Sequence, residues 1–336
     1  METSRQCKVA AVQAEPVHLD LPATLAKMES LIGEAAGKGA NLIVFPETFL
    51  SAYPAWVPDI YNDQSAEHAR YIGRPWMQYW NDFVESSVAV PSDATARIGR
   101  AASAANAYVV VGVNEKSTSS DEQVQLYNGS VVFAPDGSVI GNRRKLTPVV
   151  HEQIYHGRGD ERDVKLFQTE FGKLGVAHCF ENFSPLYRHA LASMGEQIHC
   201  ALWYSLASTG PLVEAAARLH AIESGAWVVV AVQYNAGAQE KDSANLEPNW
   251  RSQGGSVIVS PAGEYVAGPI YGEETILYAD IDPAARRAMK AVWDPIGREG
   301  RPDVFDFSIR RGAKGMSSES PLEIPIQLPE ADREAH

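Results

Sequence analysis

Residues 173–189, with the sequence KLGVAHCFENFSPLYRH, carry the clearest signal for the fold. The apolar residues 174–177 predict a short strand that leads to Cys179. Pro185 then opens an apolar pattern with helical spacing, because proline favours the first turn of a helix. The thiol is therefore expected at a sharp turn, where backbone N–H groups lower the pKa of a thiol and can bind an oxyanion.

The alternation of strands and helices continues on both sides of this segment. Hydrophobic spacing predicts strands at 9–14, 41–45, 108–113, 199–204, 227–232, 254–260 and 275–281, a hairpin at 127–140, and helices at 21–36, 94–107, 212–224 and 284–289. No linker divides this pattern, so we predict one layered α/β domain at residues 1–309. The polar, proline-containing residues 310–336 predict an extended C-terminal tail.

The composition narrows the class of partner. The chain has 29 Lys and Arg against 42 Asp and Glu, a formal charge of −13, which disfavours nucleic acid and anionic membrane surfaces. No apolar run approaches the ~20 residues that span a bilayer, and acidic residues follow the N-terminus too soon for a secretory signal. Three cysteines do not make a disulfide framework. We therefore expect a cytoplasmic protein with a small-molecule partner, no nucleic acid and no membrane.

Three reactive side chains each follow a predicted strand. Glu47, Lys145 and Cys179 all lie just past a strand's carboxyl end, where sites assemble in α/β sheets. Each also has a simpler interpretation. Glu47 can be an ordinary acidic residue of a surface loop, and residues 143–145 can form a solvated turn. Cys179 can be a buried apolar residue of the core, as we expect for Cys7 and Cys200.

The histidines do not suggest a metal site. His178 is next to Cys179, but adjacent residues of an extended segment point to opposite faces, so we expect it to pack away from the sulfur. The spacing of the others is not that of zinc ligands. These are His18, His68, His151, His156, His189, His199 and His220. We therefore predict no metal.

Three ordered motifs carry a family resemblance. Residues 45–50 read FPETFL, residues 144–148 read RKLTP, and residues 179–182 read CFEN. Flanking segments agree, among them GRGD at 157–160, GEQIH at 195–199 and DPIG at 294–297. From residue 9 to about residue 305 the sequence resembles the carbon–nitrogen hydrolase superfamily, and its nitrilase branch in particular.

The resemblance implies a four-layer α-β-β-α sandwich and a Glu–Lys–Cys triad without a metal or organic cofactor. Carried over to the matching positions, Glu47 is the general base, Lys145 stabilises an oxyanion and Cys179 is the nucleophile. Glu152, seven residues past the lysine, matches a second glutamate that supports the substrate or water. These four are the expected catalytic residues.

The resemblance also points to residues near the substrate. Tyr53, Phe180 and Trp203 match positions close to the substrate pocket. Members of the nitrilase branch usually have tryptophan directly after the cysteine and often at the position of Tyr155, and this chain has Phe180 and Tyr155 there. Both changes keep an aromatic ring, so they affect the expected substrate more than the expected reaction.

The expected activity is hydrolysis of an organic nitrile to a carboxylic acid and ammonia, through a cysteine thioimidate and an acyl-thioester. A cyanide-degrading enzyme, or an amidase or carbamoylase with the same triad, remains an alternative, as does a non-enzymatic scaffold that kept the fold. The resemblance implies a homodimer or a larger spiral homo-oligomer. The class of nitrile, aliphatic, arylaliphatic or aromatic, stays open.

Overall fold

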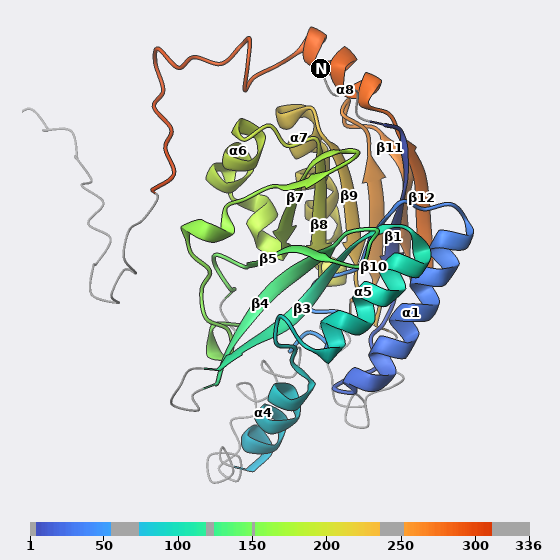
Figure 1. The fold of residues 1–336 in the computed structure, drawn as a ribbon. Coiled ribbons are helices and arrows are strands. Elements are labelled where there is room, and N and C mark those ends of the chain that lie inside the picture. The colour runs from blue at the N-terminus through green and yellow to red at the C-terminus, as the bar shows by residue number, and fades with distance from the viewer. Residues whose placement is uncertain (1–4, 55–73, 119–123, 150–151, 236–251, 311–336) are drawn as a thin grey trace, which may run out of the picture.

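The computed structural model describes residues 5–54, 74–118, 124–149, 152–235 and 252–310. Two six-stranded mixed sheets lie face to face, with helices on their outer sides (Figure 1). The apolar core between the sheets joins Val44 and Val110 of one sheet to Val176 and Val229 of the other. This is the predicted α-β-β-α sandwich, in which each sheet buries one face against the other and one against helices.

The first sheet has the order β12-β1-β2-β3-β4-β5. Its two central pairs, β1 with β2 and β2 with β3, are parallel, and the outer pairs are antiparallel. Its strands are β1 (Cys7–Gln13), β2 (Leu42–Val44), β3 (Tyr108–Thr118), β4 (Val124–Phe133), β5 (Val139–Arg144) and β12 (Thr275–Ile281).

The second sheet has the order β11-β10-β9-β8-β7-β6 and the same pattern of pairing, with β7, β8 and β9 parallel. The three parallel strands are almost completely buried, which explains their continuous apolar sequences. The strands are β6 (Phe167–Thr169), β7 (Gly172–His178), β8 (Ile198–Trp203), β9 (Trp227–Val232), β10 (Gly254–Val259) and β11 (Tyr265–Tyr271).

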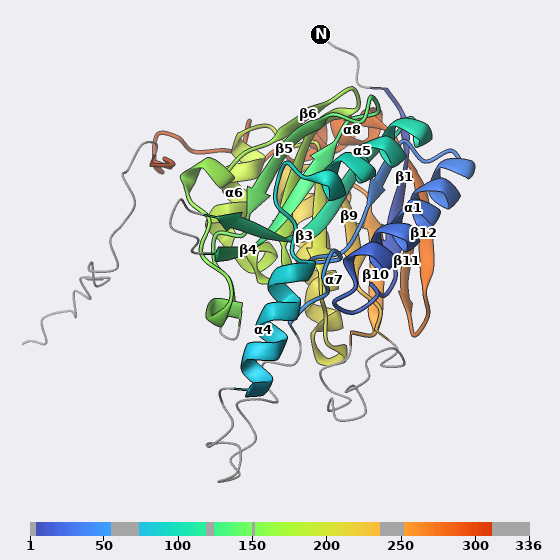
Figure 2. The ribbon, with the colours of Figure 1, turned by 60° about the horizontal axis from the view of Figure 1, so that its bottom comes forward.

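Helices cover the outer faces of both sheets. Helices α1 (Leu21–Gly37) and α5 (Asp93–Ala105) pack on the first sheet, and α6 (Pro185–Ser193) and α7 (Gly210–Ser224) pack on the second. Helix α4 (Arg74–Ser86) lies outside the layers, at one end of the sandwich (Figures 1 and 2). Among the described residues the chain also forms α8 (Pro283–Val292), and short 3₁₀ turns occupy Glu152–Ile154, Glu161–Asp163, Cys179–Phe183 and Ala207–Thr209.

The structure confirms the fold class and most predicted elements. It adds β6, a strand of three residues that was not predicted, and extends β3 to Thr118. Within the described residues, none of the helices has the length and apolar character to span a bilayer. The predicted tail lies outside the described residues except for Arg310, so the division into a domain at 1–309 and a tail at 310–336 stays a prediction.

Candidate active site

Glu47 lies in the loop that follows β2, and its side chain is fully buried. Its Oε1 accepts hydrogen bonds from Asn128 Nδ2 at 2.7 Å and from Lys145 Nζ at 2.8 Å. Its Oε2 accepts from the backbone N–H of Tyr204 at 3.2 Å. The carboxylate is therefore held by β4, by the end of β5 and by the segment after β8, which together span both sheets.

A glycine on β3 makes room for this loop. A Cβ atom added to Gly112 would lie 2.5 Å from Thr48 N and 2.6 Å from Glu47 Cα, and real Cβ atoms do not approach backbone so closely. The backbone N–H of Gly112 also donates to Pro46 O at 3.2 Å. The absence of a side chain on β3 thus sets how deeply Glu47 enters the sandwich.

Lys145 directly follows β5 and its side chain is also fully buried. Its Nζ contacts Glu47 and both carboxylate oxygens of Glu152, at 3.0 and 2.9 Å. Glu152 is fixed in turn by the Tyr53 hydroxyl at 2.8 Å and by the backbone N–H of Val149 at 3.0 Å. One buried ammonium group thus bridges two buried carboxylates, which compensates for the cost of burying each charge.

Cys179 directly follows β7, and only 5% of its surface is exposed. Its φ of +48° lies in the left-handed region, which is uncommon for a residue other than glycine. Its Sγ lies 4.0 Å from the carbonyl oxygen of Tyr204, whose N–H donates to Glu47. The sulfur and the Glu47 carboxylate therefore both contact the backbone of Tyr204.

Burial dominates the electrostatics of these groups. It raises the pKa of Glu47 to about 7, because the attraction of Lys145 only partly offsets desolvation and the repulsion of Glu152. Burial also raises the pKa of Glu152, but Lys145 more than offsets this and the pKa lies below its ordinary value. Desolvation lowers the pKa of Lys145, yet the two carboxylates outweigh it, so the pKa is raised and the ammonium stays charged.

The expected direction of the thiol pKa was wrong. Burial, followed by the charge of Glu47, raises the pKa of Cys179 well above its ordinary value, although Lys145 and the backbone N–H of Phe180 act in the opposite direction. The turn donors predicted from the sequence are present, but desolvation outweighs them. The resting thiol is therefore protonated, and a neighbouring base must remove its proton before it can react.

A buried ion pair joins the strands that carry Lys145 and Cys179. Arg143 donates from both terminal nitrogens to Glu181, at 2.7 and 2.8 Å. The oxygens of Glu181 also accept from the backbone N–H groups of Leu146 at 2.7 Å and His178 at 2.9 Å. The interpretation of residues 143–145 as a solvated turn is wrong, because the side chain of Arg143 is fully buried and that of Arg144 pairs with Glu115 at 2.6 Å.

His178 belongs to this ion-pair network. Its ring is fully buried and its Nδ1 lies 3.0 Å from an Arg143 nitrogen. Burial lowers the pKa of His178 to about 4, so the ring is neutral at neutral pH. Its contacts are with Arg143 and Glu181, which agrees with the expectation that it packs away from the Cys179 sulfur.

The three residues predicted near the substrate occupy different settings. Tyr53 is buried, bonds Glu152 and stacks on Tyr204 with ring centroids 4.4 Å apart. Phe180 is 44% exposed and meets Trp203 edge-on at 6.1 Å. Trp203 is buried in the apolar cluster that contains Cys179 and residues of α7. Their role in binding the substrate stays a prediction.

Several contacts of the site were not predicted from the sequence. The Asn128 amide and the Tyr204 backbone bind Glu47, and Asn128 belongs to a strand without any motif. Glu181 and Asn182 belong to the CFEN motif, so the sequence placed them close to Cys179. Their hydrogen-bond partners could not be predicted from the sequence.

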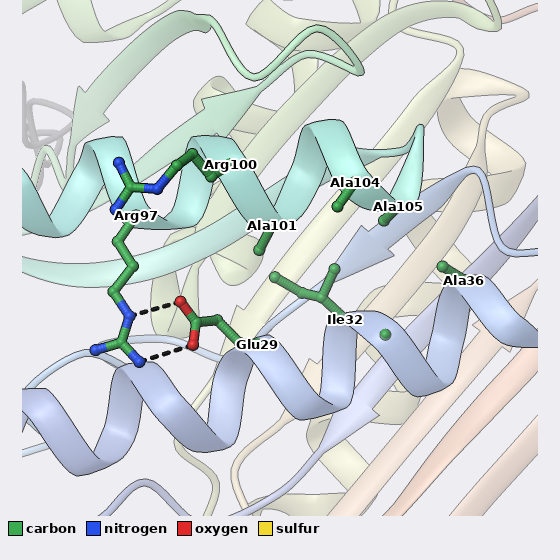
Figure 3. Close-up of a pocket in the computed structure, with 9 residues that line it drawn as sticks. Glu29, Ile32, Ala36, Arg97, Arg100, Ala101, Ala104 and Ala105 are labelled. Carbon is green, nitrogen blue, oxygen red and sulfur yellow. Dashed lines mark hydrogen bonds and ion pairs between the residues drawn. The ribbon is translucent and has the colours of Figure 1, made fainter.

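A separate surface pocket of about 430 Å³ lies between α1 and α5 (Figure 3). Small side chains line most of it, and Glu29 pairs with Arg97 at 2.5 and 2.7 Å along one side. Its lining includes none of the predicted site residues. The pocket is a groove in the helical layer that covers the outer face of the first sheet, so the first sheet separates it from the second.

Comparisons with known proteins identify the family of this chain. The family model described as carbon-nitrogen hydrolase matches residues 8–291. Nitrilase 1 of Arabidopsis thaliana is 34% identical over 322 residues, which cover 91% of this chain and 87% of that protein. An aliphatic nitrilase of Rhodococcus rhodochrous is 34% identical over 326 residues, with 93% and 84% covered.

Solved structures share the fold. Nit3 of Saccharomyces cerevisiae, a member of branch 10 of the nitrilase superfamily, has a TM-score of 0.67 at 22% identity and covers 87% of this chain and 96% of its own. The NitFhit protein of C. elegans has a TM-score of 0.72 at 18% identity, with 94% and 70% covered. With the family model matched over most of its length, the chain belongs to the carbon–nitrogen hydrolase family.

Proposed function

We propose that the protein is a nitrilase that hydrolyses an organic nitrile to a carboxylic acid and ammonia. The observation that carries the proposal is the buried contact of Lys145 with Glu47 and Glu152 beside the Cys179 thiol, a nucleophile, a base and a cation in one desolvated site. The choice of a nitrile over an amide is supported by relatives named nitrilase that are about one-third identical over most of the chain.

In the first step the sulfur of Cys179 attacks the nitrile carbon. Glu47 takes the thiol proton and passes it to the nitrile nitrogen, so a C–S bond forms and one C–N π bond breaks. The product is a covalent thioimidate. A base whose pKa is raised to about 7 suits this exchange, because it can both accept and return a proton near neutral pH.

In the second step water adds to the thioimidate carbon. Glu47 removes a proton from the water, and a tetrahedral intermediate forms beside the ammonium group of Lys145. Protonated nitrogen leaves as ammonia and an acyl-thioester remains, which a second water hydrolyses to the acid and the free thiol. If the C–S bond breaks at the tetrahedral stage instead, the product is an amide.

Lys145 and Glu152 are proposed to act through charge. Lys145 stays protonated between its two carboxylates, so it stabilises negative charge that develops on the intermediate without giving up its proton. Glu152 keeps that ammonium in place, and the Tyr53 hydroxyl fixes Glu152. Loss of a comparable electrostatic donor costs roughly 100- to 1000-fold in rate.

A substrate panel tests the function. Ammonia release is measured with aliphatic, arylaliphatic and aromatic nitriles, with the matching amides and with free cyanide. We expect at least one organic nitrile to be turned over much faster than its amide, and the Cys179→Ala variant to fold and be inactive. Preference for amides or for cyanide would favour the related enzymes, and no turnover by the wild type would favour a scaffold.

We also infer a cytoplasmic homo-oligomer. The cytoplasmic setting is supported by three free, buried cysteines. The oligomer is supported by large apolar side chains that are exposed on the outer helices of the second sheet, namely Leu186 on α6 and Leu212 and Leu219 on α7, at 70, 54 and 47%. Neighbouring exposed apolar residues of this kind mark surfaces that associate.

A further inference from the structure

The GEQIH motif builds a buried cluster behind the reactive cysteine. Glu196 precedes β8, His199 lies on β8 and His220 on α7, and none of the three is more than 2% exposed. The two oxygens of Glu196 bind the two histidines separately, with 2.8 Å to His199 Nδ1 and 2.7 Å to His220 Nε2. Strand β8 pairs with β7, which leads to Cys179 (Figure 1).

The cluster is connected to the cysteine by one side chain. His199 Nε2 lies 2.9 Å from Asn182 Oδ1, and Asn182 Nδ2 donates to the backbone carbonyl of Cys179 at 2.8 Å. A continuous chain of hydrogen bonds therefore runs from Glu196 through His199 and Asn182 to Cys179.

Counting donors and acceptors assigns the direction of each hydrogen bond between Glu196 and Cys179. A carbonyl oxygen only accepts, so the amide NH₂ of Asn182 faces Cys179 and its oxygen faces His199. His199 Nε2 must then carry a hydrogen. Its Nδ1 faces the carboxylate of Glu196, which is ionised because the two histidines outweigh the desolvation that opposes ionisation and lower its pKa to about 2. Both ring nitrogens of His199 therefore have a partner in the chain, the carboxylate of Glu196 at Nδ1 and the side-chain oxygen of Asn182 at Nε2.

The second histidine, His220, binds the remaining oxygen of the Glu196 carboxylate. His220 Nε2 donates to the other oxygen of Glu196, and within the described residues its Nδ1 has no hydrogen-bond partner. Burial and the charge of His199 lower the pKa of His220, which agrees with a neutral ring. The two histidines therefore bind both oxygens of the buried Glu196 carboxylate and fix its position.

The same three residues have a composition that could bind a metal ion. However, ligand atoms around one tetrahedral zinc lie roughly 3.4 Å apart, given bonds of about 2.1 Å. The oxygen–nitrogen distances of 2.7 and 2.8 Å are those of hydrogen bonds. The carboxylate also packs directly against Gly175 of β7, where a Cβ atom would collide with Glu196 Oε1. The geometry favours a closed hydrogen-bond network.

We propose that the chain Glu196–His199–Asn182 is a positioning device for the nucleophile, which holds the carbonyl of Cys179 and thereby keeps its backbone in the left-handed conformation that turns the sulfur toward Glu47. A backbone of this kind costs roughly 1–3 kcal/mol and persists only where its surroundings hold it. The effect on turnover rests on the proposed function, whereas the effect on thiol reactivity does not.

The first test is the Asn182→Asp variant. Aspartate still accepts from His199 Nε2, but it cannot donate to the Cys179 carbonyl. We expect kcat to fall about 10- to 100-fold with a change in KM below about threefold, because misplacement of a reacting group slows chemistry more than binding. Asn41→Asp is the matched control, because Asn41 only accepts through Oδ1, from Lys8 N, and it should behave as wild type.

A second pair of variants separates position from charge, since Asn182→Asp adds an anion near the sulfur. Glu196→Gln allows His199 Nδ1 to accept from the new amide while Nε2 still donates to Asn182, so activity should stay within about threefold of wild type. The double variant Glu196→Gln/His199→Phe keeps the ring shape and the neutral partner but removes the bond to Asn182. We expect the double variant to lose about 10- to 100-fold in kcat relative to the single variant.

Alkylation of Cys179 by iodoacetamide, followed by peptide mass analysis, gives a readout that needs no substrate. We expect the same order of rates as for kcat, so failure of nitrile hydrolysis in the wild type would leave this test intact. Variants that change only in thermal stability, and not in alkylation or kcat, would overturn the proposal. So would a stoichiometric metal in the wild type that Glu196→Gln removes.

Discussion

At the scale of single residues, the site depends on burial more than on attraction between charges. Glu47 has a cationic partner at 2.8 Å, yet its pKa is raised because the carboxylate is fully desolvated and faces a second carboxylate. The thiol of Cys179 stays protonated for the same reason. A protonated thiol beside a carboxylate that titrates near neutrality is a pair poised for proton transfer.

This pair predicts the pH dependence of activity. With the pKa of Glu47 raised to about 7, its basic form is lost as the pH falls through 7, so kcat/KM should fall tenfold per pH unit on the acid side. The same raised pKa means that folding stability decreases as the pH rises toward 7, because the folded state binds this proton more tightly than the unfolded chain. A rate profile from pH 5 to 9 measures the first effect, and a flat profile across pH 5–7 would refute it.

The reactive residues could be predicted from the sequence, because Glu47, Lys145 and Cys179 each follow a strand and belong to a distinctive motif. The direction of the pKa shift of the Cys179 thiol could not be predicted, because it depends on how deeply the turn is buried. The sequence also could not reveal that Asn182 connects Cys179 to His199, 17 residues farther along the chain.

At the scale of elements, β5 and β7 are joined by the Arg143–Glu181 pair, which lies two residues before Lys145 and two after Cys179. Glu181→Gln removes the charge and leaves Arg143 buried without its partner. We expect a loss of about 3–5 kcal/mol in the free energy of unfolding, measured by chemical denaturation, together with reduced activity.

The matched control for this pair is an exposed ion pair. Asp303→Asn disrupts the bond to Arg301, where both side chains are more than half exposed, and stability should not change measurably. Equal effects of Glu181→Gln and Asp303→Asn would show that the buried pair does not hold the two strands.

Gly112 of β3 gives a second test at this scale. Gly112→Ala places a methyl group against the backbone of Glu47 and Thr48, so the loop that carries Glu47 must shift. We expect lower stability and a loss of about 100-fold in kcat, since a displacement near 1 Å has such an effect. Gly33→Ala in α1 has open space around its Cβ and should stabilise the protein by roughly 0.5–1 kcal/mol without affecting kcat. Normal activity of Gly112→Ala would contradict this account of the loop.

Most helices and strands could be predicted because the spacing of their hydrophobic residues shows whether one face or both faces of the element are buried. The solvated turn at 143–145 was predicted wrongly because the register of the β4–β5 hairpin decides which arginine points inward, and spacing alone does not fix that register. Strand β6 was missed because three residues are too few to show a period.

At the scale of the whole molecule, the site is assembled between the two sheets. Glu47 and Lys145 follow strands of the first sheet, and Cys179 follows a strand of the second. Buried amides also cross between the sheets, since Gln13 of β1 binds the backbone of β10 and β11, and Gln233, after β9, donates to Glu47 O at 3.0 Å. Packing of the sheets and assembly of the site are therefore the same event.

The outer helices predict self-association. Leu186 and Leu212 are exposed on α6 and α7, and a polar substitution there should weaken an interface without disturbing the core. We expect light scattering to give a dimer or larger species for the wild type and a lower mass for Leu186→Glu/Leu212→Glu. A monomeric wild type would refute the proposed homo-oligomer.

In the proposed reaction Cys179 bonds covalently to the carbon of a nitrile, with Glu47 and Lys145 acting on the same centre. Intact-mass analysis of the protein, acid-quenched during turnover of a slowly hydrolysed nitrile, tests it most directly. We expect a mass increase equal to the nitrile or to its acyl group, located on the peptide that contains Cys179 and absent from Cys179→Ala. Turnover without such an adduct, or an adduct on Cys7 or Cys200, would contradict it.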